Sequence, residues 1–130
     1  RIKRLVKEDI IKKFTILPNF SLLGCSWYTL VIEMKTFEKK EEMKFKEFVR
    51  NHLYITSAEK TLGPWDVIVY IIADNPKNFH KTIKQIKTEF PTMVRSYDTF
   101  IAYREHAFYP FPKILTNKTG IPSKNTHQNI

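Results

Sequence analysis

Several residue types and patterns that define protein classes are scarce in this sequence. Cys25 is the only cysteine among the 130 residues, so no internal disulfide can form, and we expect a reducing, cytoplasmic location. No apolar run approaches the roughly 20 residues of a membrane span, and no signal peptide opens the chain. Acidic residues are also few, 13 against 22 Lys and Arg, which leaves a net charge of +9. This charge suits a polyanionic partner, although a basic surface for solubility explains it equally well.

The sequence also lacks patterns typical of metal, phosphate and catalytic sites. The three glycines form no glycine-rich phosphate loop and no nucleophile elbow. The four histidines show no metal-ligand spacing with one another or with the cysteine: His52, His80, His106 and His127. We therefore predict no metal and no cofactor, and a protein that is not an enzyme.

The most informative stretch that is present runs from Trp65 to Ala73, where eight of nine residues are apolar. Most are β-branched or aromatic, which favours a strand over a helix. The preceding Gly63-Pro64 is a turn signal, since glycine tolerates positive φ and proline fixes the next φ. Because both faces of this strand are apolar, both must be covered.

The order of the surrounding patterns predicts the fold class. Helical stripes alternate with strand patterns in the order strand, helix, strand, strand, helix, strand. The expected ranges are Cys25 to Thr36, Glu38 to Leu53, Tyr54 to Thr61, Trp65 to Ala73, Asn75 to Phe90 and Val94 to Arg104. This order predicts an α+β, ferredoxin-like βαββαβ fold, an antiparallel four-stranded sheet with both helices on one face. A second copy packed on the other face would make a dimeric αβ sandwich, although a ligand or another protein could cover it instead.

The two ends lie outside this pattern. Arg1 to Glu8 is typical of a helix end, with Asp9 as its stop, and Ile10 to Leu17 is predicted to be a linker strand. We expect three segments: 1–24 as a helix end with its linker strand, 25–108 as the main domain, and 109–130 as a partly flexible extension. Because the chain begins in the middle of a helical pattern, we expect it to be part of a longer protein.

Four places together resemble the feast/famine, or Lrp/AsnC, family of transcription regulators. Arg1-Ile2-Lys3-Arg4-Leu5 followed by Ile10-Ile11-Lys12-Lys13-Phe14 is similar to the family's junction after its recognition helix. Leu23-Gly24 matches the entry into the sensor domain, Gly63-Pro64-Trp65-Asp66 the sensor hairpin, and Val94 with Thr99 the final strand. The resemblance covers about residues 1–108. Two positions depart from the family pattern: Asp9 replaces a glycine, and Pro64 stiffens the turn.

The resemblance implies a function. In this family a helix-turn-helix binds DNA, the sensor domain dimerises through its sheet, and a small effector binds beside the hairpin between dimers. That effector is usually an amino acid. The chain would then be a sensor and assembly domain, dimeric or of higher order, with the end of the DNA-binding domain attached.

The candidate site residues follow from this hypothesis. Asp66 could hold an ammonium while N–H groups near Gly63 hold a carboxylate. Trp65 could line the pocket and Thr99 could donate a hydroxyl. The structural alternatives are a turn role for Gly63 and Asp66, an interface or core position for Trp65, and an ordinary strand position for Thr99. The expected DNA-phosphate contacts are Lys3, Arg4, Lys12 and Lys13, for which a solvated helix end is the alternative.

Two other functions are compatible with the sequence. Siroheme decarboxylases resemble the same family, and Lys84, Arg95, Arg104 and His106 could surround a tetrapyrrole, but they form no recognisable motif. A stand-alone sensor that oligomerises without touching DNA is the third hypothesis.

Overall fold

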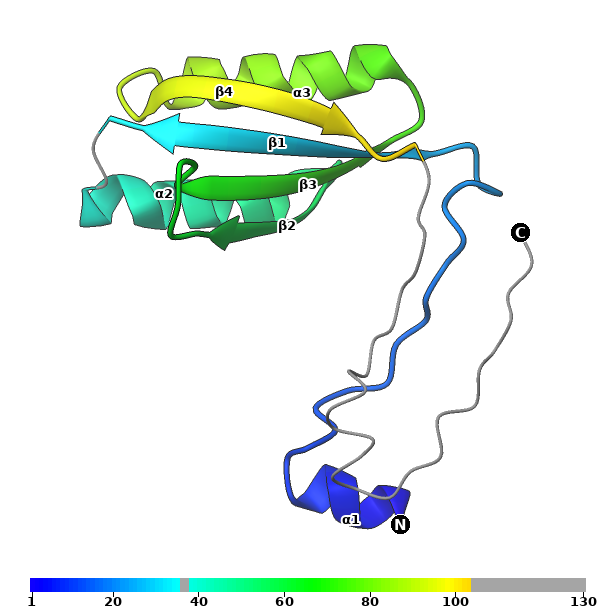
Figure 1. The fold of residues 1–130 in the computed structure, drawn as a ribbon. Helices are drawn as coiled ribbons and strands as arrows, with labels where there is room; N and C mark the ends of the chain where they lie inside the picture. The colour runs from blue at the N-terminus through cyan, green and yellow to red at the C-terminus, as the bar shows by residue number, and fades with distance from the viewer. Residues whose placement is uncertain (36–37, 104–130) are drawn as a thin grey trace.

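The computed structural model describes residues 1–35 and 38–103, and it contains three helices and four strands in those ranges. Their order is α1 (Ile2–Lys7), β1 (Ser26–Met34), α2 (Lys39–Asn51), β2 (Ile55–Lys60), β3 (Val67–Ala73), α3 (Pro76–Glu89) and β4 (Val94–Ile101). The strands form one antiparallel sheet in the order β2-β3-β1-β4 (Figure 1). The predicted α+β, ferredoxin-like βαββαβ fold is confirmed.

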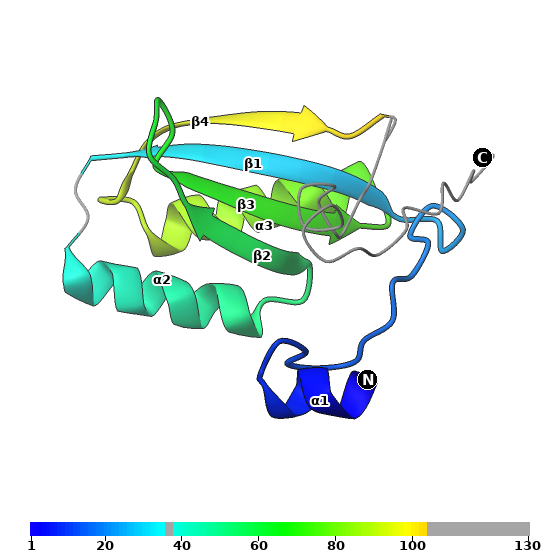
Figure 2. The same ribbon diagram turned by 60° about the horizontal axis from the view of Figure 1, so that its bottom comes forward.

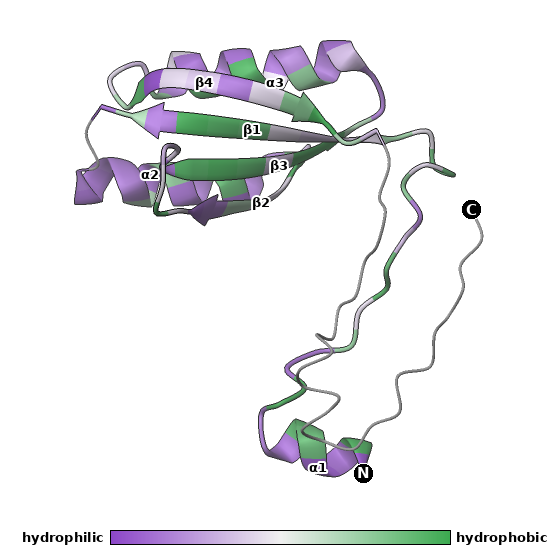
Figure 3. Cartoon of the chain, in the orientation of Figure 1, coloured by the Kyte–Doolittle hydropathy of each residue, from purple (hydrophilic) through white to green (hydrophobic). Residues whose placement is uncertain are grey.

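Helices α2 and α3 cover one face of the sheet (Figures 1 and 2). Alternate residues of β1 and β3 point to that face and are buried with residues of both helices in one core cluster. Leu30 of β1 pairs with Val69 of β3 at the centre, and these side chains are 1% and 0% exposed. Figure 3 shows β1 and β3 as the hydrophobic centre of the sheet. The core therefore lies between the two central strands and the helix layer.

The sequence sets both ends of α3 by local chemistry. The Asn75 side chain accepts a hydrogen bond from the Asn78 N–H at 2.9 Å, and Pro76 occupies the first turn, where its missing N–H costs nothing. Phe79, Ile83 and Ile86 form the buried stripe. Pro91 follows the C-cap residue Phe90, whose carbonyl accepts from the Met93 N–H, so the chain turns directly into β4.

The second face of the sheet carries no helix, and most of its side chains on β1 and β3 are apolar. On β3 this open face presents Ile68, Tyr70 and Ile72, which are half-buried. Their partners on β1 include Trp27, 40% exposed, and Val31, which is buried. Phe100 of β4 lies beside Thr29 on the same face and is 52% exposed. The two-faced apolarity of β3 is therefore real, and one face has no covering layer among the described residues.

The N-terminal segment corrects one prediction and agrees with another. Asp9 has a φ of 56°, in the left-handed region, so it ends α1 as expected. The predicted strand from Ile10 to Leu17 is wrong, because residues 11–19 have no regular secondary structure. A strand needs a partner for its backbone groups, and no described segment pairs with this one. Its side chains at Phe14 and Ile16 are 73% and 84% exposed.

The turn before β3 also differs from its expected conformation. Among the described glycines only Gly24 has a positive φ, so Gly63 does not use the left-handed region. The reason is Pro64, whose ring restricts the preceding residue to extended conformations. A Cβ at Gly63 would meet nothing within 4 Å, so an alanine would fit there. Gly63 is therefore not required by turn geometry.

Candidate functional site

The β2–β3 hairpin holds three of the four predicted effector residues. It is closed by a backbone hydrogen bond from the Thr61 N–H to the Asp66 carbonyl at 2.9 Å, and the Thr61 hydroxyl donates to the Trp65 carbonyl. The loop between these residues is short and exposed at Gly63. Trp65 is half-buried and lies outside the core cluster, so the core role considered for it does not apply.

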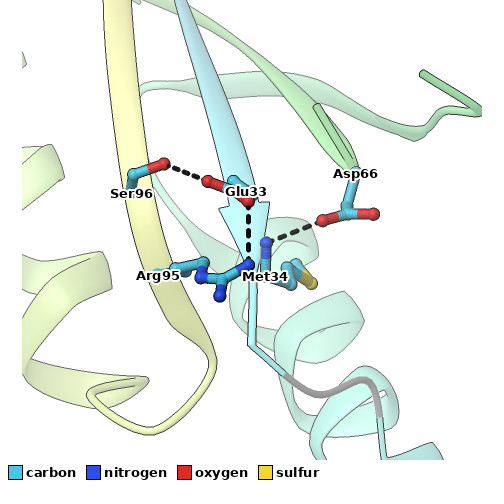
Figure 4. A network of polar contacts seen from close by, with 5 residues as sticks. All are labelled: Glu33, Met34, Asp66, Arg95 and Ser96. Carbon is cyan, nitrogen blue, oxygen red and sulfur yellow. Dashed lines mark hydrogen bonds and ion pairs between the residues drawn. The ribbon is translucent and has the colours of Figure 1, made fainter. Parts of the chain in front are cut away.

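Asp66 joins the hairpin to the end of β1. Its carboxylate oxygen Oδ2 accepts a hydrogen bond from the Met34 N–H at 2.7 Å (Figure 4). The N–H of Asp66 donates to the Ile32 carbonyl at 2.9 Å. The carboxylate is thus not bonded to its own turn, as the structural alternative supposed, but to a neighbouring strand. Figure 4 also shows that the second carboxylate oxygen points away from Met34.

Glu33 brings a second carboxylate to the same end of β1 (Figure 4). It accepts hydrogen bonds from the Ser96 hydroxyl at 2.6 Å and from Arg95 Nη1 at 3.2 Å, both on β4. The Ser96 hydrogen bond is the main cause that lowers the pKa of Glu33, and Arg95 adds a smaller lowering. Desolvation of the carboxylate and, to a smaller extent, the charge of Asp66 oppose the shift. The cluster of Glu33, Asp66 and Arg95 therefore carries one net negative charge.

Replacing Ser96 by alanine tests this account of Glu33. Ser96→Ala should raise the pKa of Glu33 toward its ordinary value of 4.5, because the main stabiliser of the carboxylate is lost. Because the pKa of Glu33 is lower in the folded than in the unfolded state, Glu33 stabilises the fold at pH values above its unfolded-state pKa. This contribution is lost as the pH falls through the folded-state pKa. The variant should therefore lose less stability on acidification than the wild type. An NMR titration of the Glu33 side chain measures the shift, and Arg95→Gln should give a smaller one. An unchanged pKa in Ser96→Ala would contradict the assignment.

Two backbone donors near Asp66 are open. Within residues 1–35 and 38–103, nothing accepts a hydrogen bond from the N–H of Gly63 or of Trp65. The absence of a side chain at Gly63 leaves its backbone approachable. The hairpin can thus present donors beside a carboxylate, the pairing that an amino acid needs.

Thr99 lies elsewhere. It pairs with Leu30 across β1 and faces α3, in a groove of about 430 Å³ lined also by His80, Lys84 and Tyr97. Because β1 separates β3 from β4, the structure does not bring Thr99 to the hairpin within one chain. The sequence alone could not show that Thr99 and the hairpin lie apart, because the order of the strands in the sheet determines their positions.

The predicted DNA-contacting residues are all exposed. Lys3 and Arg4 lie on α1, where the Arg4 Nε pairs with the Glu8 carboxylate at 2.8 Å. Lys12 and Lys13 lie in the irregular segment that follows. Figures 1 and 2 show α1 apart from the sheet, and none of its residues is buried.

Sequence reasoning missed Glu33, and it indicated the lysines of α3 only as an excess of positive charge along one helix. The signal for Glu33 was available, since it is a lone acid in an otherwise apolar strand. Lys84 and Arg95 are also the residues considered above for a tetrapyrrole; in the structure Lys84 lines the groove and Arg95 pairs with Glu33. Arg104, His106 and the segment 109–130 lie outside the described residues.

In the part of the chain that the structure describes, no helix is long and apolar enough to cross a membrane.

The domain belongs to the α+β class, with a four-stranded antiparallel sheet and one open face. No family model matches the sequence. The uncharacterized HTH-type transcriptional regulator PH0061 of Pyrococcus horikoshii is 29% identical over 96 residues, which are 74% of this chain and 62% of that protein. A Pyrococcus abyssi regulator of the same description is 28% identical over equal shares of each chain. The chain thus spans less than two thirds of the length of these relatives.

Solved structures give the same result at the level of fold. The PH0061 crystal structure aligns with a TM-score of 0.65 and 23% identity, over 82% of this chain and 71% of that one. An AsnC family regulator from Agrobacterium tumefaciens gives 0.74 at 11% identity, over 88% and 74%. A Neisseria meningitidis transcriptional regulator in complex with L-Met gives 0.76 at 13% identity, over 91% and 75%. The resemblance to Lrp/AsnC regulators inferred from the sequence is confirmed, and the fold is the one that these regulators share.

Proposed function

We propose that this chain is the sensor and assembly part of a DNA-binding transcription regulator of the Lrp/AsnC type. The observation that carries the proposal is the agreement of two comparisons. The sequence is similar to an HTH-type regulator over 96 residues, and the fold is that of an AsnC family regulator over 88% of this chain. The protein would act by binding, not by catalysis, and in the cytoplasm. The proposed segments are 1–24, 25–108 and 109–130, as defined above.

The open face of the sheet is the proposed dimer interface. It presents apolar side chains on three strands, namely Ile68 and Tyr70 on β3, Val31 on β1 and Phe100 on β4, with the polar Thr29 and Asp98 among them. Apolar surface of this kind is covered in stable proteins, and a second copy of the same sheet offers a self-complementary cover.

The hairpin, with the carboxylate of Asp66 and that of Glu33 at the adjoining end of β1, is the proposed effector site, and an amino acid is the proposed effector. The second oxygen of Asp66 would accept from the ammonium, and the N–H groups of Gly63 and Trp65 would donate to the carboxylate. The single net negative charge of the Glu33, Asp66 and Arg95 cluster favours an ammonium there. The L-Met complex of the Neisseria regulator provides a precedent on the same fold. Thr99 would join this site only from another subunit.

DNA would be bound mainly by a helix-turn-helix of which α1 is the last helix. Lys3, Arg4, Lys12 and Lys13 would contribute phosphate contacts at its edge.

A binding experiment tests the regulator hypothesis. A protein that includes the complete helix-turn-helix should bind its operator tightly, with affinity that falls steeply as salt rises, because phosphate contacts release counterions. Residues 1–130 alone should bind DNA weakly and with no sequence preference. Fluorescence anisotropy with operator and scrambled duplexes measures both. Tight, sequence-selective binding by residues 1–130 alone would place the DNA-reading surface elsewhere, and no operator binding by the complete protein would refute the hypothesis.

A further inference from the structure

The solvent face of α3 carries a row of positive charges that belongs neither to the proposed effector site nor to the proposed dimer interface. Four lysines and one histidine lie on this 14-residue helix and are exposed; we call them the α3 basic face: Lys77, His80, Lys81, Lys84 and Lys87. Their spacing of three and four residues places them on one side of the helix. The opposite side is the buried stripe that packs on the sheet. The basic face therefore points away from the core.

This face is not neutralised by its surroundings. The only acidic residue of α3 is Glu89, which pairs with Lys44 of α2 at 3.9 Å. Within residues 1–35 and 38–103, Lys77, Lys81 and Lys84 form no ion pair. Helix α2 differs, since its acids are interspersed with its bases and Glu42 pairs with both Lys46 and Lys60. Evenly mixed charge is typical of a solvated helix, whereas charge of one sign favours a charged partner.

The groove beside β4 extends the basic face. Lys87 lies over the Tyr97 ring, 4.9 Å from its centroid, and the hydroxyls of Thr88 and Thr99 line the groove with Lys84. These groups are ammonium and hydroxyl donors, which suit phosphate oxygens. A second hollow, lined in part by Arg95 and Ser96, adjoins the groove and shares Lys87 and Tyr97 with it. The groove therefore lies between α3 and β4, next to the α3 basic face.

We propose that the α3 basic face and its groove bind the phosphodiester backbone of duplex DNA without reading its sequence. This nucleic-acid contact is separate from the one at α1. The helix is about 21 Å long and carries a cation at nearly every turn, so several successive phosphates could be contacted. A small anion would use only the groove and would leave Lys77 and Lys81 without a role. The face also stays accessible when the open side of the sheet is covered, because the helices lie on the other side (Figure 2). The inference rests on the proposed function in one respect, the choice of DNA as the polyanion that the basic face binds.

The test uses residues 1–130 and a duplex of arbitrary sequence at low salt. Lys81→Gln/Lys84→Gln removes two charges from the α3 basic face while keeping polar, unbranched side chains. Lys39→Gln/Lys40→Gln removes two exposed charges from α2, and Lys12→Gln/Lys13→Gln removes two from the linker. The α3 variant should reduce the slope of log affinity against log salt by about 2, roughly one for each phosphate that is no longer neutralised. It should weaken binding at low salt by about tenfold or more. The α2 variant should change the slope by much less.

Circular dichroism and thermal unfolding should be unchanged in all three variants, since every substituted lysine is exposed. Equal losses of affinity in the α2 and α3 variants would mean that DNA binding depends only on the net charge of the protein, which would overturn the inference. A loss only in the Lys12 and Lys13 variant would place all DNA binding at the linker and also overturn it. Binding of poly-L-glutamate as tight as that of DNA, or full competition by millimolar ATP, would overturn the assignment to a nucleic-acid backbone. None of these outcomes depends on operator binding by the complete protein, so the inference and the proposed function can fail separately.

Discussion

Val69→Lys should unfold the domain, whereas Ile68→Lys, one residue away, should leave it folded and dissociate the dimer. Val69 is 0% exposed and lies at the centre of the core between β1 and the helices. Burying an unpaired ammonium there should cost several kcal/mol, comparable to the whole stability of about 5–15 kcal/mol of a typical domain. Ile68 points to the open face, where a lone chain can hydrate the charge and only the partner copy would bury it.

Light scattering and circular dichroism separate the two results. Wild type should be at least dimeric at micromolar concentration, Ile68→Lys monomeric with native circular dichroism, and Val69→Lys unfolded. Leu62→Lys is the matched control, because Leu62 is fully exposed in the hairpin loop and a lysine there should change neither property. A wild type that is monomeric and well folded would contradict the dimer hypothesis. An Ile68→Lys protein that stays dimeric would move the interface away from the open face.

Asp66→Asn should weaken effector binding about ten- to a hundredfold while leaving the fold intact. Asparagine keeps an oxygen that can accept from the Met34 N–H, so the link between the hairpin and β1 survives. It removes the negative charge, and a charge-assisted hydrogen bond to an ammonium is worth roughly 1.5–3 kcal/mol. Asp66→Ala should lose the same affinity and, in addition, about 1–3 kcal/mol of unfolding free energy, because the Met34 N–H is left without its acceptor.

Calorimetry with each of the twenty amino acids, followed by chemical denaturation of both variants, measures these effects. Glu33→Gln is a useful third variant, because it removes the neighbouring charge without touching Asp66 or Met34. Equal binding of one amino acid by wild type and Asp66→Asn would mean that Asp66 only joins the hairpin to β1 and that the effector binds elsewhere. If no amino acid binds wild type, the amino-acid sensor hypothesis fails.

The elements of the sheet and of its helix layer can be predicted from local patterns in the sequence. Strands β1 and β3 were predicted within a few residues, because period-two alternation and unbroken β-branched runs are local properties. Helix α3 was equally clear, since Asn75 and Pro76 mark its start and Pro91 follows its end. The apolarity of both faces of β3 also indicated an open face that needs a cover. The stop at Asp9 followed from the intrinsic tolerance of that residue type for the left-handed region.

Features that depend on which strands are neighbours emerge only in the folded chain. Strand order places β1 between β3 and β4, which separates Thr99 from the hairpin and brings Glu33 beside Ser96 and Asp66. The linker from Ile10 to Leu17 has the composition of a strand, but a strand exists only where its backbone groups find a partner. The hydrogen bond from Met34 to Asp66 joins residues 32 positions apart, and no periodicity encodes such a contact. Local sequence patterns determine the helices and strands. The candidate site depends on contacts between residues far apart in the sequence, and these contacts leave no local pattern.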